Sequence, residues 1–71
     1  MAEHIYAEMV ANVFAVAVAE GDVVEPGETL LVLESMKMEI PVLCEAGGTV
    51  TEVKVQPGDV VQEGDVMVVV A

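Results

Sequence analysis

The sequence predicts an all-β domain of two small antiparallel sheets folded over one core, a sandwich that closes toward a flattened barrel. Three observations lead to this prediction. The apolar residues are mostly valine, a residue that favours strands. No segment of the 71 residues keeps a helical period, while two segments alternate apolar and polar residues. The chain also nearly repeats itself, which predicts a domain with quasi-two-fold symmetry.

The internal repeat overlays residues 8–34 on residues 45–71. Ten of the 27 aligned positions are identical, and both copies share a strand, the sequence Gly-Asp-Val-Val, a later glycine and a second strand. Two copies are too few for a solenoid, so the two halves must bury their apolar faces against each other. With room for one small domain only, the sequence predicts that residues 1–71 form a single unit.

The strands follow from the pattern within each copy. Residues 13–19 and 49–55 alternate as half-buried strands do, whereas residues 29–34 and 66–70 are continuous apolar runs typical of well-covered strands. Further strands are expected at 4–9 and 38–43, with very short ones at 23–24 and 60–61. Gly-Asp at 21–22 and Pro-Gly-Asp at 57–59 indicate turns, in which Gly21 and Gly58 are expected to need positive φ.

Composition excludes several functions. The formal net charge is −11, with 13 acids against two lysines, which argues against nucleic acid and against an anionic membrane surface. Glutamates interrupt every apolar run before it reaches the ~18 residues that a membrane helix needs. The acidic N-terminal segment lacks the basic start of a signal peptide, and with one cysteine no internal disulfide can form. These features predict a cytoplasmic protein without a metal site.

One segment contradicts local turn rules. Residues 35–44 lie between the two copies and have no counterpart in the overlay. Their tight turn carries Met36-Lys37, where a two-residue hairpin usually has Asn-Gly or Asp-Gly. A functional residue is expected where a local rule is broken in this way. Lys54, the other lysine, stands opposite Ala17 in the overlay and is interpreted as a solvated strand residue.

Ser35-Met36-Lys37-Met38, preceded by Glu34, resembles the modified hairpin of the biotinyl-domain family, the biotin carboxyl carriers of biotin-dependent carboxylases. The resemblance covers essentially the whole chain, including "GETLLVLE" before the turn and "AGGTVTEVKVQPGDVVQEGDVMVVV" after it. The chain is especially similar to the small stand-alone biotinylated proteins of actinobacteria. The resemblance implies two four-stranded sheets, with both termini at one end and the lysine hairpin at the other.

The resemblance also implies a function. Biotin would be attached covalently to Lys37 by a biotin protein ligase, and would then shuttle a carboxyl group between biotin carboxylase and carboxyltransferase subunits, in an acyl-CoA or related carboxylase. A lysine amine is protonated at neutral pH and the chain supplies no base, so the domain would be a ligase substrate with no catalytic residue. Glu34, Met36 and Met38 would be recognised by the ligase. Alternatively, the methionines cover the barrel end and Glu34 is a solvated charge.

Three other interpretations stay open. A lipoyl carrier shares the fold, although its hairpin typically reads Asp-Lys-Ala, and an unmodified barrel-sandwich binding module would need no Met-Lys-Met. A phosphocarrier enzyme would need a positioned histidine, and His4 stands alone near the N-terminus. His4 is therefore interpreted as a surface residue, and Cys44 as a small buried hydrophobe.

Overall fold

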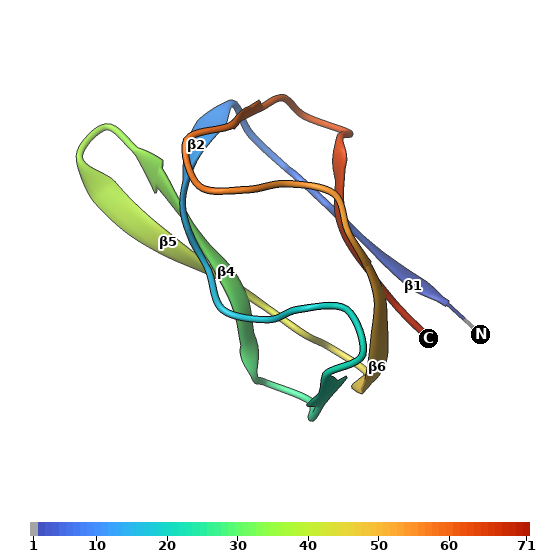
Figure 1. Cartoon of the computed structure of the whole chain (residues 1–71). Helices are drawn as coiled ribbons and strands as arrows, with labels where there is room; N and C mark the ends of the chain where they lie inside the picture. The colour runs from blue at the N-terminus through green and yellow to red at the C-terminus, as the bar shows by residue number, and fades with distance from the viewer. Residues whose placement is uncertain (1) are drawn as a thin grey trace.

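The computed structural model describes residues 2–71, in which all regular structure is β-strand (Figure 1). None of the described residues forms a helix that is long and apolar enough to cross a membrane. The strands are β1 (Glu3–Tyr6), β2 (Ala11–Val16), β3 (Val23–Val24), β4 (Thr29–Ser35), β5 (Met38–Leu43), β6 (Gly48–Val53), β7 (Val60–Val61) and β8 (Val66–Val70).

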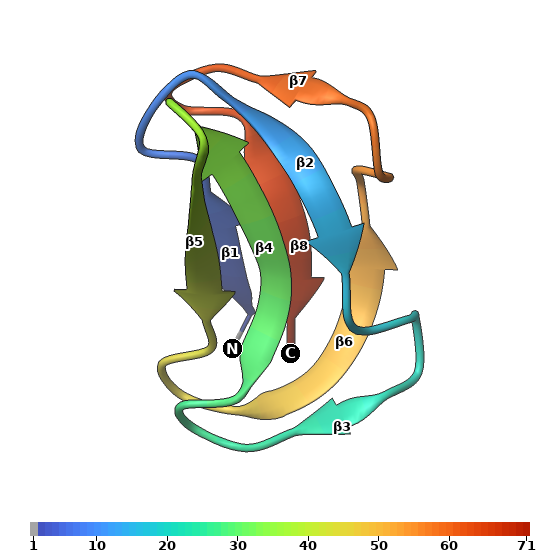
Figure 2. The same ribbon diagram turned by 90° about the vertical axis from the view of Figure 1, so that its left-hand side faces the viewer.

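The strands form two four-stranded antiparallel sheets, with strand orders β1-β8-β6-β3 and β5-β4-β2-β7. The predicted fold class, a flattened sandwich of two four-stranded sheets, is confirmed. In Figure 2 the strands β5, β4 and β2 lie side by side, with the β4–β5 turn at the top and both termini at the bottom. The domain is elongated, 32 Å by 18 Å by 17 Å, and the turn and the termini lie at opposite ends of it (Figures 1 and 2).

The core lies between the two sheets and is built mainly by the central strands β4 and β8. Leu30, Leu31 and Val68 have no exposed surface, and none of the polar or charged side chains in residues 2–71 is buried. Each of these strands has a neighbour on both edges and a sheet packed against it, which explains the continuous apolar runs in the sequence. On β2, by contrast, Val13 is buried and Phe14 exposed, as the alternation predicts.

The internal repeat appears in the backbone hydrogen bonds. The Gly21 amide donates to Val50 O at 2.8 Å, and 37 residues later the Gly58 amide donates to Val13 O at 2.9 Å. Each copy of the Gly-Asp turn is closed in the same way, by an aspartate that accepts from the amide three residues before it. Asp22 Oδ2 accepts from the Ala19 amide at 2.8 Å, and Asp59 Oδ2 from the Gln56 amide at 3.0 Å. The quasi-two-fold symmetry therefore extends to individual hydrogen bonds in the two halves, and the symmetry axis is called the quasi-dyad below.

Residues 35–44 have no counterpart in the overlay, but the structure supplies one for strand β5 within that segment. The β1–β8 pairing repeats the β5–β4 pairing, down to a register shift between Ile5 and Tyr6 that matches the shift between Thr29 and Leu31. Strand β1 is thus the counterpart of β5. The overlay missed it because these two strands share no identical residue at the 37-residue offset. The β4–β5 turn is what sets the two halves apart.

Three strands are shorter or shifted relative to the prediction. Strand β2 covers 11–16 instead of 13–19, β6 covers 48–53 instead of 49–55, and β1 covers 3–6 instead of 4–9. Consequently Lys54 lies one residue beyond β6, although its amide still donates to Met67 O at 2.8 Å. The chain then leaves this sheet and crosses to the other one, which ends the strand.

The two turn glycines have the backbone angles that the sequence predicts. Gly21 has φ 95° and Gly58 has φ 98°, values that side chains with a Cβ rarely adopt. A Cβ placed on either glycine would meet no atom within 4 Å. The requirement for glycine at these positions comes from the backbone angle and not from crowding.

Candidate functional site

The turn between β4 and β5 is a two-residue hairpin loop with left-handed backbone angles at both positions. Met36 has φ 53° and Lys37 has φ 64°, and they are the only residues with a side chain that have positive φ in the described chain, 2–71. Positive φ at both central positions is the pattern of a type I′ turn, whose twist suits a tight hairpin. A left-handed residue with a Cβ costs roughly 1–2 kcal/mol, so the turn carries strain.

The strands below the turn hold it in place. Ser35 pairs with Met38, and two pairs further down Leu33 pairs with Ile40. Leu33 is 3% exposed and belongs to the core, so the base of the hairpin is anchored there. A side chain at the turn is therefore presented from a rigid support at the end of the domain.

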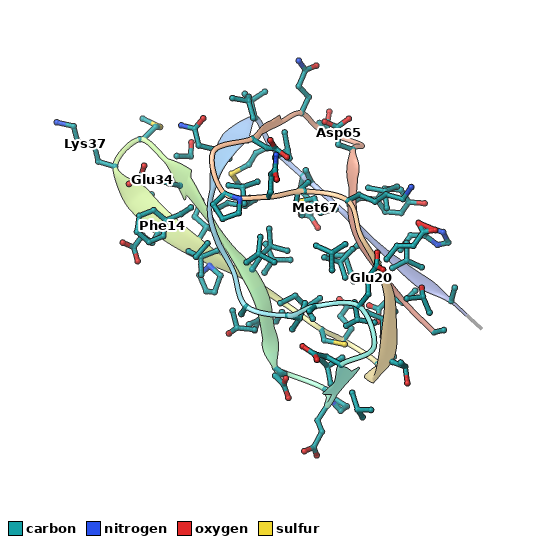
Figure 3. The ribbon with its side chains drawn as sticks, viewed as in Figure 1. Phe14, Glu20, Glu34, Lys37, Asp65 and Met67 are labelled. Carbon is teal, nitrogen blue, oxygen red and sulfur yellow. The ribbon has the colours of Figure 1, made fainter. Side chains whose placement is uncertain are left out.

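The three residues at the tip point into solvent. Lys37 is exposed, and Figure 3 shows its side chain directed away from the body of the domain. Met36 is 89% exposed and Met38 is 61% exposed. The alternative that the methionines cover the barrel end is therefore wrong. Two large apolar side chains in water, on a strained turn, are not explained by the stability of this domain.

Two carboxylates lie directly below the tip. Glu34 and Glu39 are partners across β4 and β5, Glu34 partly buried and Glu39 exposed. Within residues 2–71, ion pairing is confined to Lys54 Nζ and Glu52 Oε2, 3.2 Å apart. The two hairpin glutamates thus face each other with no ion-pair partner among the described residues, and like charges directly opposite destabilise an antiparallel pair.

A groove lies away from the hairpin tip. A hollow of about 580 Å³ runs between the edge strands β1 and β5 and includes Met9, Ile40 and Cys44 among its lining residues. Lys37 and the two flanking methionines do not line it. The hairpin is therefore a site of surface presentation and not a ligand pocket.

The other candidate residues have structural roles. Cys44 is 1% exposed and its Sγ accepts a hydrogen bond from the Gly47 amide at 3.1 Å, which confirms its reading as a small buried residue. His4 is exposed on β1, where its ring stacks on Tyr6 with 6.2 Å between centroids. No group of acidic, histidine or cysteine side chains in the described chain is arranged to hold a metal ion.

One exposed residue beside the hairpin was not predicted. Phe14 on β2 is 51% exposed, and Figure 3 shows it close to Glu34. Asn12, two residues before Phe14 on the same strand, pairs with Glu34, which places this part of β2 next to the hairpin base. The repeat contained the signal, because the residue that aligns with Phe14 is Thr51.

A symmetric all-β sandwich that presents one exposed lysine on a strained two-residue turn defines a class of protein, the small carrier domains that are modified on a hairpin lysine. The family described as "Biotin-requiring enzyme" matches residues 3–70. The chain belongs to this family. It is a biotin-carrying domain, and its place is that of a carrier and not of a catalyst.

Known proteins similar to the chain support this assignment. The "Biotinylated protein TB7.3 homolog" of Mycobacterium leprae is 52% identical over 71 residues, which is 100% of both chains. Among solved structures, the urea carboxylase of Kluyveromyces lactis superposes with a TM-score of 0.92 and 32% identity, covering 100% of this chain and 6% of the enzyme. The lipoyl domain of the 2-oxoglutarate dehydrogenase complex of Azotobacter vinelandii superposes with a TM-score of 0.76 and 26% identity, covering 87% of this chain and 78% of that domain.

Proposed function

We propose that the chain is a biotin carboxyl carrier, and that a biotin protein ligase attaches biotin to Lys37. The observation that carries the proposal is the tip geometry: Lys37 is exposed, has φ 64°, and lies on a hairpin whose base is anchored in the core. The residues present fit the group, because an amide at Lys37 Nζ needs no space within the domain. When attached, biotin supplies the ring nitrogen that carries a carboxyl group.

The attachment step forms one bond and breaks another. The uncharged Nζ of Lys37 attacks the acyl carbon of biotinyl-adenylate, which the ligase makes from biotin and ATP. An amide N–C bond forms, the bond from the acyl carbon to the phosphate oxygen breaks, and AMP leaves. The proton released by the amine passes to a base of the ligase. None of the carboxylates in residues 2–71 is paired with Lys37, so the ligase supplies the activation.

The residues around Lys37 would serve recognition. Met36 and Met38 give the ligase two flexible apolar side chains to grip, and the methionine side chain adapts easily to an irregular surface. Glu34, directly below the turn, would accept a hydrogen bond or ion pair from the ligase. This chain needs no catalytic residue in such a reaction, because it is the substrate.

After attachment, the carrier would serve biotin carboxylase and carboxyltransferase subunits of an acyl-CoA or related carboxylase in the cytoplasm. The similarity to part of a urea carboxylase supports a partner of the carboxylase class. A hairpin at one end of a 32 Å domain suits this task, because the modified side chain can enter two active sites in turn while the body of the domain stays outside. Tethering raises the effective concentration of the carried group without new contacts.

Carboxyl transfer tests this proposal. Biotinylated protein is incubated with a biotin carboxylase, ATP and labelled bicarbonate, and the label on the carrier is counted. Label should appear on the biotinylated wild type and not on unmodified protein. The positive control is the labelling of each carboxylase's own carrier under the same conditions. If several carboxylases label their own carriers but not the biotinylated protein, the carboxyl-carrier role is contradicted.

A lipoyl carrier is the second candidate, because the lipoyl domain shares the fold. Methionines on both sides of Lys37 favour biotin. Intact-mass spectrometry of the protein purified from its own host distinguishes the two, because the adducts differ in mass. An unmodified Lys37 in that sample would favour a binding module of the same fold.

A further inference from the structure

The quasi-dyad provides an internal control for exposed apolar side chains. Tyr6 and Leu43 are related by the 37-residue offset, and both are about half exposed, at 52% and 49%. Val23 and Val60 are related in the same way, at 75% and 62%. These four residues occur in both halves of the domain, including the half without the lysine turn. The shared frame accounts for them, and they require no functional explanation.

None of the remaining exposed large apolar side chains has a large apolar counterpart among the described residues of the other half. Met36 has no counterpart in the sequence, and the counterpart of Met38 is Met1, which lies outside the described residues. The other members of this set align with smaller or polar residues, and they are Met9 with Ala46, Val10 with Gly47, and Phe14 with Thr51. The β1–β2 loop that contains Met9 and Val10 lies at the same end of the domain as the lysine turn (Figures 1 and 2).

Phe14 can be compared with its counterpart, Thr51, to decide whether the fold needs a large apolar residue at this position. Phe14 lies at a β-bulge, between the pairs Val13–Leu33 and Ala15–Val32. The counterpart Thr51 lies at the equivalent bulge of β6, where its hydroxyl donates to Val69 O at 3.2 Å. The fold therefore accepts a polar residue at this bulge position. A half-exposed phenyl ring at Phe14 serves something other than the frame.

The charges next to Phe14 are also confined to this half. Glu34 and Glu39 face each other across the hairpin, and their counterparts are Ala71 and Ala2. Like charges directly opposite destabilise the pair, and neither carboxylate forms an ion pair with a cation of residues 2–71. A cation from outside the chain would therefore relieve the repulsion.

We propose that Phe14 and Glu39 extend the recognition residues Glu34, Met36 and Met38 into one docking surface for the biotin protein ligase. This inference rests on the proposed function and deepens it. Since Lys37 must enter the ligase active site, the ligase necessarily covers the surroundings of the hairpin. The fit requires an apolar hollow on the ligase for the Phe14 ring, bordered by an arginine or lysine that contacts the two carboxylates. Aromatic anchors with a charged rim are typical of such interfaces.

The apolar part is tested by the steady-state kinetics of biotin attachment, with the concentration of the unmodified carrier varied. Phe14→Thr, which introduces the residue found in the other half, should raise the KM for the carrier on the order of tenfold with little change in kcat, as for the loss of an interface hot spot. Val23→Thr removes a similarly exposed apolar residue at the end remote from the turn, and should leave KM within about twofold. Equal KM values for the two variants would overturn the proposal.

The charged part is tested by the salt dependence of the same KM. Glu39→Gln should raise KM at low ionic strength and reduce its dependence on salt, whereas Glu20→Gln, which removes an exposed charge from the β2–β3 loop, should do neither. Glu39 is exposed, so Glu39→Gln should fold normally. It therefore tests the docking surface even if Phe14→Thr folds poorly. Identical salt dependence for both glutamine variants would contradict the charged contact.

The outcomes separate this inference from the proposed function. If the wild type accepts no biotin, the proposed function fails. If the wild type accepts biotin and Phe14→Thr is equally good, the function stands and the docking surface is wrong. If Phe14→Thr accepts biotin normally but is then a poor substrate for biotin carboxylase, the surface belongs to the carboxylase and the ligase assignment is overturned.

Discussion

Met36 and Lys37 are consecutive residues that both hold left-handed backbone angles, φ 53° and φ 64°, at the tip of one hairpin. Neither residue is suited to these angles, because a Cβ crowds the neighbouring carbonyl in the left-handed region. Asn-Gly is the dipeptide that suits such a turn. The domain thus keeps a strained turn at the position where it presents its lysine.

Replacing Met36-Lys37 by Asn-Gly should stabilise the unmodified domain by about 1–2 kcal/mol, because the strain of two left-handed residues is relieved. The sequence alone suggests a smaller net gain if Met36 is half buried, because its cover of the barrel end would then be lost. Met36 is 89% exposed, so that opposing contribution is nearly absent. Urea unfolding of both proteins, without biotin, gives the difference. A clear loss of stability would show that the turn is not strained.

Gly21→Val and Gly58→Val should each destabilise the domain by about 1–3 kcal/mol, because valine resists positive φ. No atom lies within 4 Å of the position that the new Cβ would occupy, so a collision of the Cβ does not contribute to the loss. The two losses should be similar, since the turns are related by the quasi-dyad. Unchanged denaturant midpoints would refute the turn geometry.

Gly48→Ala should cost more than an alanine at Gly21, although both substitutions add one methyl group. Gly48 has φ 140°, and a Cβ there would collide with the carbonyl oxygen of Ala71. That backbone is fixed, because the Thr49 amide donates to Ala71 O and the Ala71 amide donates to Thr49 O, both at 2.8 Å. We expect a loss of about 3 kcal/mol or more, from strain and collision together. Equal thermal midpoints for Gly48→Ala and Gly21→Ala would contradict this expected difference in stability.

Asp22→Ala and Asp59→Ala should each lower the free energy of unfolding by about 0.5–1.5 kcal/mol, because each removes a hydrogen bond to a turn amide. Those bonds are 2.8 Å and 3.0 Å long and occupy equivalent places in the two halves. The double variant should lose the sum of the two single losses, since separated sites are additive. A large loss in one turn and none in the other would show that the two turns are not energetically equivalent.

Much of the fold follows from the sequence because the repeat and the valine-rich strands agree. Continuous apolar runs at 29–34 and 66–70 identify the central strands, and the glycines at 21 and 58 identify the turns. The equivalence of β1 and β5 was not predictable in this way, because it is carried by hydrogen-bond register and not by identical residues.

The candidate site was predictable only in part. Lys37 stands out because its turn breaks a local rule, whereas the exposure of Met36 and Met38 depends on how far the hairpin projects from the core. The position of Phe14 beside the hairpin could not be predicted from its strand pattern. Alternation shows that a residue points outward, but it does not show whether that residue lies near a functional site. The structure makes the difference by placing Phe14 half-exposed on β2, two residues from Asn12, the strand partner of Glu34.

The central claim is that Lys37 is the single attachment site for biotin. Wild type, Lys37→Arg and Lys54→Arg are each incubated with a biotin protein ligase, ATP and biotin, and the products are analysed by intact-mass spectrometry and peptide mapping. Both arginine variants keep the charge, and Lys54 controls for a second exposed lysine that is paired with Glu52. We expect one biotin on wild type and on Lys54→Arg, located at residue 37, and none on Lys37→Arg. Biotin on the Lys37→Arg protein would contradict this claim.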